Sequence, residues 1–588
     1  MFWLILVFSF LSNLIPVFAT NEFSVTQNID YTVNQSGDSE VAQRIDITNN
    51  FSQFVPKEYL FSLTGIKPLD IQANDDSGPI TTEIINSLTD TQIRLILTRT
   101  KVGKNQTTSF FLRYRLPKLA TPKGKTWEIT LPQFQSSLSG NLTINLKVPS
   151  SFGRLSFGPD GSLVKNDSLY SLIQLNKFNP LQKNVFVFGN VQLFDFSLKY
   201  YLNNQNHTSS LIPIALPPDT ANQKITFTKI NPRPQSIEAD NDGNWLAYFL
   251  LPSKSSIDIE VAGQAKIGSR ATKPAPTDTS LTEQLYWPIN HPDIKLLAVK
   301  YSTPKSIYDY VVGALSYDDN RLDSAARRGA LEAIAKPANS LCTDFTDLFI
   351  TIARSAGIPA REIEGFAYSN NPKIKPLNPG TDLLHAWPEY YNSDTQNWIG
   401  IDPTWAKTTN GVDFFYDLDL NHLTFVIHGS KSDYPPPPGS YKQNPQQKTI
   451  NVVFANTEIN PSLSPPTLSI KFNPFSPSQI IISNPNLQAL DNLQITSSLL
   501  KLSTKLPSLP PLSQNTVNLS RVPIFSSILP QNQKINLSVS YFPNHQNTVA
   551  ISNPFHYLSL LGLIITSLTI ISLGGIMLTR INLHEKIL

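Results

Sequence analysis

Short runs of alternating apolar and polar residues dominate the first half of this sequence. Residues 23–31, 92–98 and 255–261 are three examples, and turn residues separate such runs. A period of two predicts β-strands that bury one face. The 46 prolines against 25 glycines also favour many short strands joined by turns. We therefore expect residues 20–270 to form an antiparallel β-sandwich region, made of one sandwich or two.

The length of 588 residues exceeds what one hydrophobic core supports, since cores stop growing at about 250 to 300 residues. Helical periodicity first appears after Leu281, which predicts a new domain over residues 281–433. The proline-rich segment 434–447 favours an extended linker. Alternating runs return over residues 448–552, which predicts an immunoglobulin-like β-sandwich. The predicted fold class is multidomain.

The two ends of the chain are apolar. Residues 2–18 are almost all apolar and end in Val17-Phe18-Ala19, which predicts a secretory signal peptide over residues 1–19. The segment contains no Lys or Arg, so the positively charged region that usually begins a signal peptide is missing. An uncleaved N-terminal anchor is therefore the alternative.

Residues 557–578 carry no charge, and a helix of that length spans about 33 Å, so we expect one transmembrane helix there. Arg580 and Lys586 follow it, which predicts a cytoplasmic tail over residues 579–588. The protein is then expected in the cell membrane, single-pass, with its large N-terminal part extracellular.

The charges are nearly balanced, with 47 basic and 44 acidic side chains, and long runs of one sign are absent from the sequence. Such a chain is a poor partner for nucleic acid. The eight histidines lack the spacing of a zinc site, and only one cysteine accompanies them. We therefore expect no metal and no cofactor.

Cys342 is the only cysteine, so the chain can form no internal disulfide. A lone cysteine is more often a small buried residue than a catalyst, and its neighbourhood has to decide. Residues 342–356 place apolar side chains at helical spacing, with Ser340 or Asn339 as a cap and Gly357 as a stop. Cys342 then lies in the first helical turn, where unpaired N–H groups and the helix dipole stabilise a thiolate.

His385 and Asp402 flank a predicted β-hairpin. His385 begins one apolar run, turn residues follow at 392–397, and a second run ends at Asp402. Their separation of 17 positions lets the two side chains face each other across paired strands, within hydrogen-bond reach. Packed against the cysteine helix, this hairpin would supply a base and a carboxylate that orients it.

Four motifs in this order resemble the transglutaminase-like superfamily, which is related to papain-type proteases. They are Cys342-Thr-Asp-Phe, Gly357-Ile-Pro-Ala-Arg361, His385-Ala-Trp and Asp402-Pro-Thr. The resemblance covers residues 281–439 and departs from the family at Ser340-Leu341, where a glycine is common. It implies an α+β papain-like core with Cys342 as nucleophile, His385 as general base and acid, and Asp402 as the orienting carboxylate. It also suggests a bacterial-type surface protein.

Such a triad acts on protein or peptide amides, by transfer of the acyl group to an amine or by hydrolysis. Its partners are expected to be protein or peptide substrates at the cell surface. The Cys342 backbone N–H would be one oxyanion donor, and Trp287 is a candidate for the other. The alternative function is a binding or adhesion protein that uses an inactive transglutaminase-like scaffold.

Overall fold

The computed structural model divides into two compact units. The first unit comprises residues 1–122 and 127–188, and the second comprises residues 123–126 and 189–588. The predicted signal peptide and the predicted cytoplasmic tail lie outside the described residues. The structure describes residues 22–87, 90–136, 140–159, 162–175, 184–268, 278–324, 326–369, 375–379, 382–409, 412–416, 418–471, 478–519, 534–541, 545–552 and 564–577.

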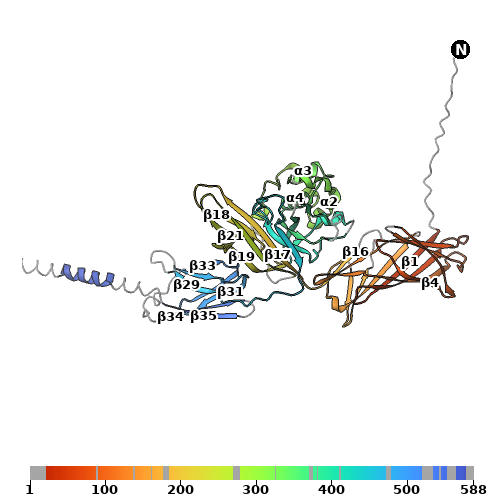
Figure 1. The fold of residues 1–588 in the computed structure, drawn as a ribbon, viewed down its shortest axis with the longest axis horizontal. Helices are drawn as coiled ribbons and strands as arrows, with labels where there is room; N and C mark the ends of the chain where they lie inside the picture. The colour runs from red at the N-terminus through yellow and green to blue at the C-terminus, as the bar shows by residue number, and fades with distance from the viewer. Residues whose placement is uncertain are drawn as a thin grey trace, which may run out of the picture. The chain divides into compact units, whose positions relative to one another are not determined.

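The first unit consists of three β-sheets around one apolar core (Figure 1). Strand β1 alternates buried and solvent-facing residues, as its period of two predicts. The eight-stranded sheet has the order β14 (Leu163–Asn166), β15 (Tyr170–Leu175), β12 (Gly140–Pro149), β1 (Phe23–Val33), β2 (Ser39–Asn49), β8 (Thr107–Leu116), β4 (Leu69–Asp75) and β5 (Gly78–Pro79). The pair β1–β12 is parallel, unlike the antiparallel pairing expected from the sequence.

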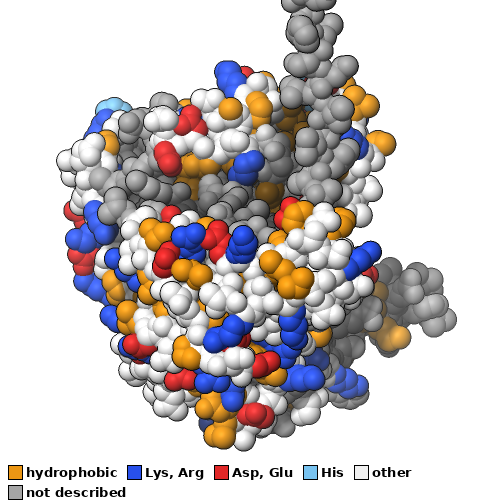
Figure 2. Space-filling model, turned by 90° about the vertical axis from the view of Figure 1, so that its right-hand side faces the viewer, with side chains coloured by type: hydrophobic (Ala, Val, Ile, Leu, Met, Phe, Trp, Pro, Cys, Tyr) orange, Lys and Arg blue, Asp and Glu red, His pale blue; other side chains and the backbone are white. Residues whose placement is uncertain are grey.

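Two four-stranded sheets complete this unit. One has the order β13 (Leu155–Phe157), β16 (Asn184–Phe188), β10 (Thr126–Leu131) and β9 (Ala120–Lys123). The other has the order β11 (Gln133–Ser136), β3 (Glu58–Thr64), β7 (Asp90–Ile96) and β6 (Thr81–Asn86). On the face drawn in Figure 2, basic and acidic side chains are interspersed, in keeping with the nearly balanced charge of the sequence.

The second unit begins with two sheets that share a core. One has the order β19 (Gln223–Asn231), β22 (Ser255–Ile267), β17 (Gln192–Asn204) and β28 (Ile450–Phe454), and the other has the order β18 (Ser210–Leu216), β21 (Trp245–Leu251) and β20 (Ser236–Ala239). Leu423 and Phe425 from a later sheet also belong to this core, so the site described below rests on this β layer.

That later sheet carries the candidate site. Its order is β24 (Asn378–Pro379), β25 (Leu383–Asn392), β23 (Ala360–Ala367) and β27 (His422–His428), with β26 (Asn397–Gly400) paired to β25. The helices of this region are α1 (Pro292–Lys300), α2 (Pro304–Ala314), α3 (Ala330–Ala335), α4 (Cys342–Ser355) and α5 (Pro403–Thr408), with the 3-10 helices η2 (Asp278–Leu281) and η3 (Asp319–Ser324). Helix α4 packs against β25 and β23 and is contacted by α1, α2 and α3.

Strand β27 is the edge of this sheet, and buried amide side chains from the β layer complete its hydrogen bonds. Gln223 exchanges two bonds with the backbone of Thr424, at 2.8 and 2.9 Å. Asn244 does the same with Ile427, at 2.7 and 2.8 Å. A buried edge strand needs such partners because its free N–H and C=O groups are otherwise costly. These four hydrogen bonds hold β27 against the β layer.

The last β region has two sheets around a core of its own. One contains β29 (Thr467–Lys471), β30 (Gln479–Ser483) and β33 (Gln514–Asn518), and the other contains β32 (Leu502–Leu509), β31 (Leu490–Ser497), β34 (Lys534–Tyr541) and β35 (His545–Ser552).

The expectation of a transmembrane helix over residues 557–578 is wrong. The structure describes a helix over residues 564–577, and no helix among the described residues is long and apolar enough to cross a membrane. Residues 557–563 and 578 of this prediction lie outside the described residues. The predicted fold class is therefore corrected to a mostly β chain with a central α+β region.

Candidate active site

Cys342 is the first residue of α4 and is buried. The helix is capped by the Asp344 carboxylate, which accepts from the Leu341 N–H at 2.8 Å. The predicted cap by Ser340 or Asn339 is thus wrong, because Ser340 instead pairs its backbone with the segment around Tyr317. The position of Cys342 in the first turn agrees with the sequence, and first-turn N–H groups lack acceptors within the helix.

Helix α4 is buried on all sides, whereas the sequence indicated an amphipathic helix. Every residue except Thr343 and Ser355 is buried. Its acidic side chains remain inside because arginines from the preceding segment reach them. Arg321 and Arg328 pair with Asp344, and Arg327 pairs with Asp347 and, at 2.8 Å, with Glu362. These ion pairs offset charges that would otherwise oppose a thiolate at Cys342.

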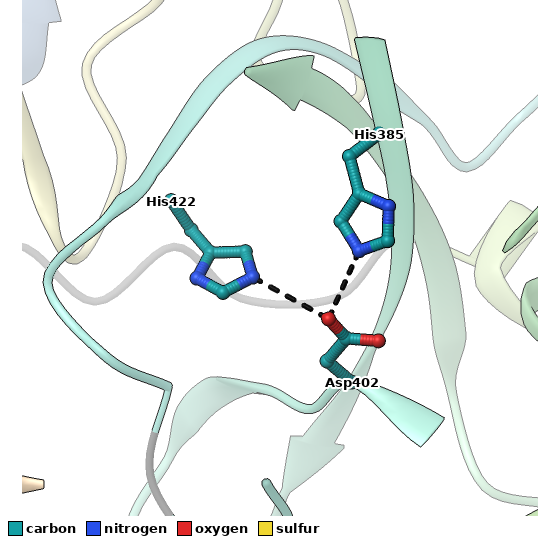
Figure 3. Close-up of side chains that lie close together, drawn as sticks. All are labelled: His385, Asp402 and His422. Carbon is teal, nitrogen blue, oxygen red and sulfur yellow. Dashed lines mark hydrogen bonds and ion pairs between the residues drawn. The ribbon is translucent and has the colours of Figure 1, made fainter. Parts of the chain in front are cut away.

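His385 and Asp402 lie together, as the sequence predicts, but by a different route. The ring Nε2 of His385 lies 2.9 Å from Asp402 Oδ2, and both side chains are fully buried (Figure 3). Strand β26 ends at Gly400, and the cross-strand partner of His385 is Gly365 on β23. Asp402 is instead the N-cap of α5, where its Oδ1 accepts from the Trp405 N–H at 2.9 Å.

Aromatic rings enclose this pair. The Trp405 ring stacks on His385 with centroids 4.9 Å apart, and the Trp387 ring stacks at 5.9 Å. Such walls exclude water, which strengthens the electrostatic coupling between His385 and Asp402.

The pKa values of the pair are shifted strongly. Burial lowers the pKa of His385, but Asp402, followed by Cys342, outweighs burial and raises it to about 9. Burial raises the pKa of Asp402, but His385 and then His422 bring it down to about 2. At neutral pH the site therefore holds an imidazolium beside a carboxylate. Because Cys342 contributes to the rise at His385, its thiol lies within electrostatic reach of the ring.

His422 is a member of this site that the sequence analysis assigned no role. Its Nδ1 lies 2.9 Å from Asp419 Oδ1, and its Nε2 lies 3.5 Å from Asp402 Oδ2. Lys375 Nζ contacts the other oxygen of Asp419 at 3.0 Å. Burial lowers the pKa of His422, but Asp419 and Asp402 raise it to about 9. No spacing in the sequence signals this contact, since His422 comes from β27 at the far edge of the sheet.

The comparisons with known proteins bear on the same segment. Residues 295–403 match the family model of the Transglutaminase-like superfamily. We call residues 295–403 the transglutaminase-like region because of this similarity. The resemblance seen in the sequence is thereby confirmed, and the matched residues include Cys342, His385 and Asp402. His422 lies outside the transglutaminase-like match. No curated protein matches this chain in sequence.

Solved structures are similar over part of the chain. A cysteine-protease candidate from Cytophaga hutchinsonii is 16% identical, with a TM-score of 0.29, and the similarity covers 46% of this chain and 94% of that one. The periplasmic domain of TgpA from Pseudomonas aeruginosa, bound to ethylmercury, is 13% identical, with a TM-score of 0.20, covering 37% of this chain and 90% of that one. An M1 zinc metallopeptidase from Deinococcus radiodurans is 12% identical, with a TM-score of 0.20, covering 32% of this chain and 45% of that one.

The candidate active site also brings together three side chains of types that can bind metals. Among the described residues, His385, Asp402 and His422 form the one group whose ligand atoms lie within 4.8 Å of one another. Each of these atoms already faces another member of the group, at 2.9 or 3.5 Å. One hydrogen bond and one ion pair between imidazole and carboxylate therefore account for their spacing.

The structure replaces one of the two predicted oxyanion donors. The Nε1–H of Trp287 donates to Asp347 at 2.7 Å, so the expectation for Trp287 is wrong. The Tyr317 hydroxyl is buried and has no hydrogen-bond partner among the described residues. Burial, and then the charge of Cys342, raises the pKa of Tyr317 well above its usual range. Tyr317 pairs with Ser340, two residues before Cys342, and its hydroxyl is protonated and able to donate.

Proposed function

We propose that this protein is a thiol enzyme that acts on protein or peptide amides, with Cys342 as nucleophile, His385 as acid and base, and Asp402 as the orienting carboxylate. One observation carries the proposal. The only cysteine of the chain begins a buried helix that packs against the strand of His385, and Nε2 of this histidine lies 2.9 Å from a buried aspartate. A structural cysteine has no need of that arrangement.

The chemistry follows from which ring nitrogen is engaged. Nε2 of His385 faces Asp402, so Nδ1 is left to exchange a proton with Cys342 and the substrate. The thiolate attacks the amide carbon, a C–S bond forms, the C–N bond breaks, and His385 Nδ1 gives its proton to the leaving amine. Asp402 holds the ring in the tautomer that this step requires.

Two donors would stabilise the oxyanion of the tetrahedral intermediate. One is the backbone N–H of Cys342 in the first turn of α4, and the other is the Tyr317 hydroxyl. Tyr317→Phe removes the hydroxyl group and is expected to lower kcat about a hundred- to a thousandfold. Because a phenyl ring still fills the space, alkylation of Cys342 should be almost unchanged. A variant with wild-type kcat would remove Tyr317 from this role.

The thioester then reacts with an amine or with water, which gives acyl transfer or hydrolysis. A glutamine peptide offered to the purified full-length protein distinguishes them. Release of ammonia that depends on Cys342 and His385 supports the enzyme, and incorporation of a labelled amine identifies a transferase. Absence of ammonia or peptide cleavage from wild-type protein would favour the binding or adhesion alternative. A location outside the cell stays a prediction from the sequence.

A further inference from the structure

Asp402 Oδ2 is shared by two histidine rings, and one of them lies outside the proposed triad. His385 Nε2 approaches this oxygen at 2.9 Å, and His422 Nε2 approaches it at 3.5 Å (Figure 3). Nε2 of His422 is buried and has no hydrogen-bond partner among the described residues. A ring nitrogen held in this position, beside a carboxylate in a dry site, interacts strongly with its charge.

The ring of His422 is held in place by Asp419 on the side away from Asp402. Asp419 Oδ1 lies 2.9 Å from His422 Nδ1, and Lys375 neutralises the other Asp419 oxygen at 3.0 Å. Burial raises the pKa of Asp419, but Lys375 and His422 hold it well below its usual range. Since an ionised carboxylate only accepts, Nδ1 of His422 carries a proton.

The ring of His422 also has fixed walls. The Trp405 ring lies 4.7 Å from it, centroid to centroid, and the Trp387 ring lies 5.0 Å from it. Its strand β27 is locked to the β layer by Gln223 and Asn244. The same two tryptophans enclose His385. Both histidines therefore meet Asp402 inside one aromatic compartment.

We propose that His422 is a positioning residue of the active site: its cationic ring, fixed by Asp419, shares the Asp402 oxygen that holds His385 and keeps this carboxylate ionised and oriented. The inference rests on the thiol chemistry proposed above. Charges then alternate from Lys375 through Asp419, His422 and Asp402 to His385.

The role has a measurable consequence. The rings of His385 and His422 lie 6.1 Å apart, centroid to centroid, so the positive charge on His422 disfavours a proton on His385. The groups that face His422 are Asp419, Asp402 and His385, with Lys375 behind Asp419. Removing only the charge of His422 should raise the pKa of His385, whereas a purely structural residue would change stability alone.

The test uses the single cysteine as its own probe. We would measure the rate constant for alkylation of Cys342 by iodoacetate across about pH 4 to 10 in the full-length protein. The rate should rise as the thiolate forms and fall as His385 loses its proton. His422→Gln keeps an N–H donor but loses the charge, and should move the upper limit upward by about one pH unit. Asp419→Asn leaves the ring in place and should move it in the same direction by less.

A matched control lies on the same strand. His428 is also a buried histidine of β27 and pairs with a carboxylate, Glu362, at 2.7 Å. His428→Gln should leave both pH limits unchanged. Melting temperatures show which variants are folded. If His422→Gln does not fold, the pH limits of Asp419→Asn alone test the role of His422. If the folded His422→Gln and Asp419→Asn variants keep the pH limits of the wild-type alkylation rate, the proposed role of His422 is overturned. A wild-type protein without enhanced alkylation at any pH would instead overturn the proposed function.

Discussion

The transglutaminase-like region contains two clusters of buried carboxylates that are neutralised by different cations. On one side of α4, Asp344 and Asp347 pair with arginines. At the candidate active site, Asp402 is neutralised by His385 and His422. A guanidinium keeps its proton at any pH a protein meets, so the arginine cluster is a fixed structural element. An imidazole can lose its proton, so the histidine cluster can take part in proton transfer.

The largest expected difference is between matched substitutions of one aspartate in each cluster. Asp402→Asn should lower kcat/KM about a thousandfold or more, because the amide no longer holds His385 in the productive tautomer. Asp347→Asn should leave a measurable rate and mainly reduce stability. Steady-state kinetics together with melting temperatures separate the two effects. Equal losses of kcat/KM in both variants would contradict the distinction between a structural arginine cluster and a catalytic histidine cluster.

Arg327→Ala tests the fixed cluster. The substitution leaves Asp347 and Glu362 buried without their guanidinium, and removing one partner of a buried pair costs about 3 to 5 kcal/mol. Burial already raises the pKa of Asp347 to about 6, although Arg327 opposes the rise. Urea denaturation followed by tryptophan fluorescence measures the loss. An unchanged denaturation midpoint would show that the arginine cluster contributes little to stability.

The histidine cluster should make stability depend on pH in the alkaline range. His385 and His422 have pKa values of about 9 in the folded protein and about 6.5 when unfolded. The folded state thus binds more protons between these values. The contribution is complete below pH 6.5 and is lost as the pH rises through 9, by roughly 3 kcal/mol at most for each histidine.

Denaturation curves at pH 7 and about 9.5 check this dependence, and His422→Gln should flatten it. A free energy of unfolding that rises over this interval would contradict the assigned charges.

Trp287→Phe has the smallest expected effect. It removes the N–H that donates to Asp347 at 2.7 Å and keeps most of the aromatic volume. A loss of about 1 to 3 kcal/mol in stability is expected, since Asp347 loses one donor in a buried site. The activity per folded molecule should not change. A selective loss of kcat would instead restore Trp287 as a candidate for the oxyanion site.

The sequence predicts those parts of the site that depend on local pattern. Residues at helical spacing place Cys342 in the first turn of α4, and the predicted hairpin forms between β25 and β26. Two details fail because tertiary contacts decide them. The hydrophobic pattern cannot show that arginines from another segment bury the polar face of α4, nor that Asp402 leaves the strand and caps α5. The expected membrane helix is not found, since no helix among the described residues is long and apolar enough to cross a membrane.

His422 and Tyr317 are missed for a related reason. Each reaches the site from another element, and neither has a sequence spacing to Cys342 that marks it. Their signals are structural: one is a buried ring nitrogen aimed at Asp402, and the other is a buried hydroxyl without a partner among the described residues. Such polar atoms are informative because burial without a hydrogen bond is costly.

The central claim of the proposal is that Cys342 is a nucleophile whose reactivity depends on His385. The direct measurement is its alkylation by iodoacetamide near pH 6, in wild-type protein and in His385→Ala, with a free thiol as reference. The single cysteine makes the label site-specific. We expect wild-type protein to react much faster than the free thiol and His385→Ala to lose this advantage. Equally slow reaction in both proteins would contradict the account.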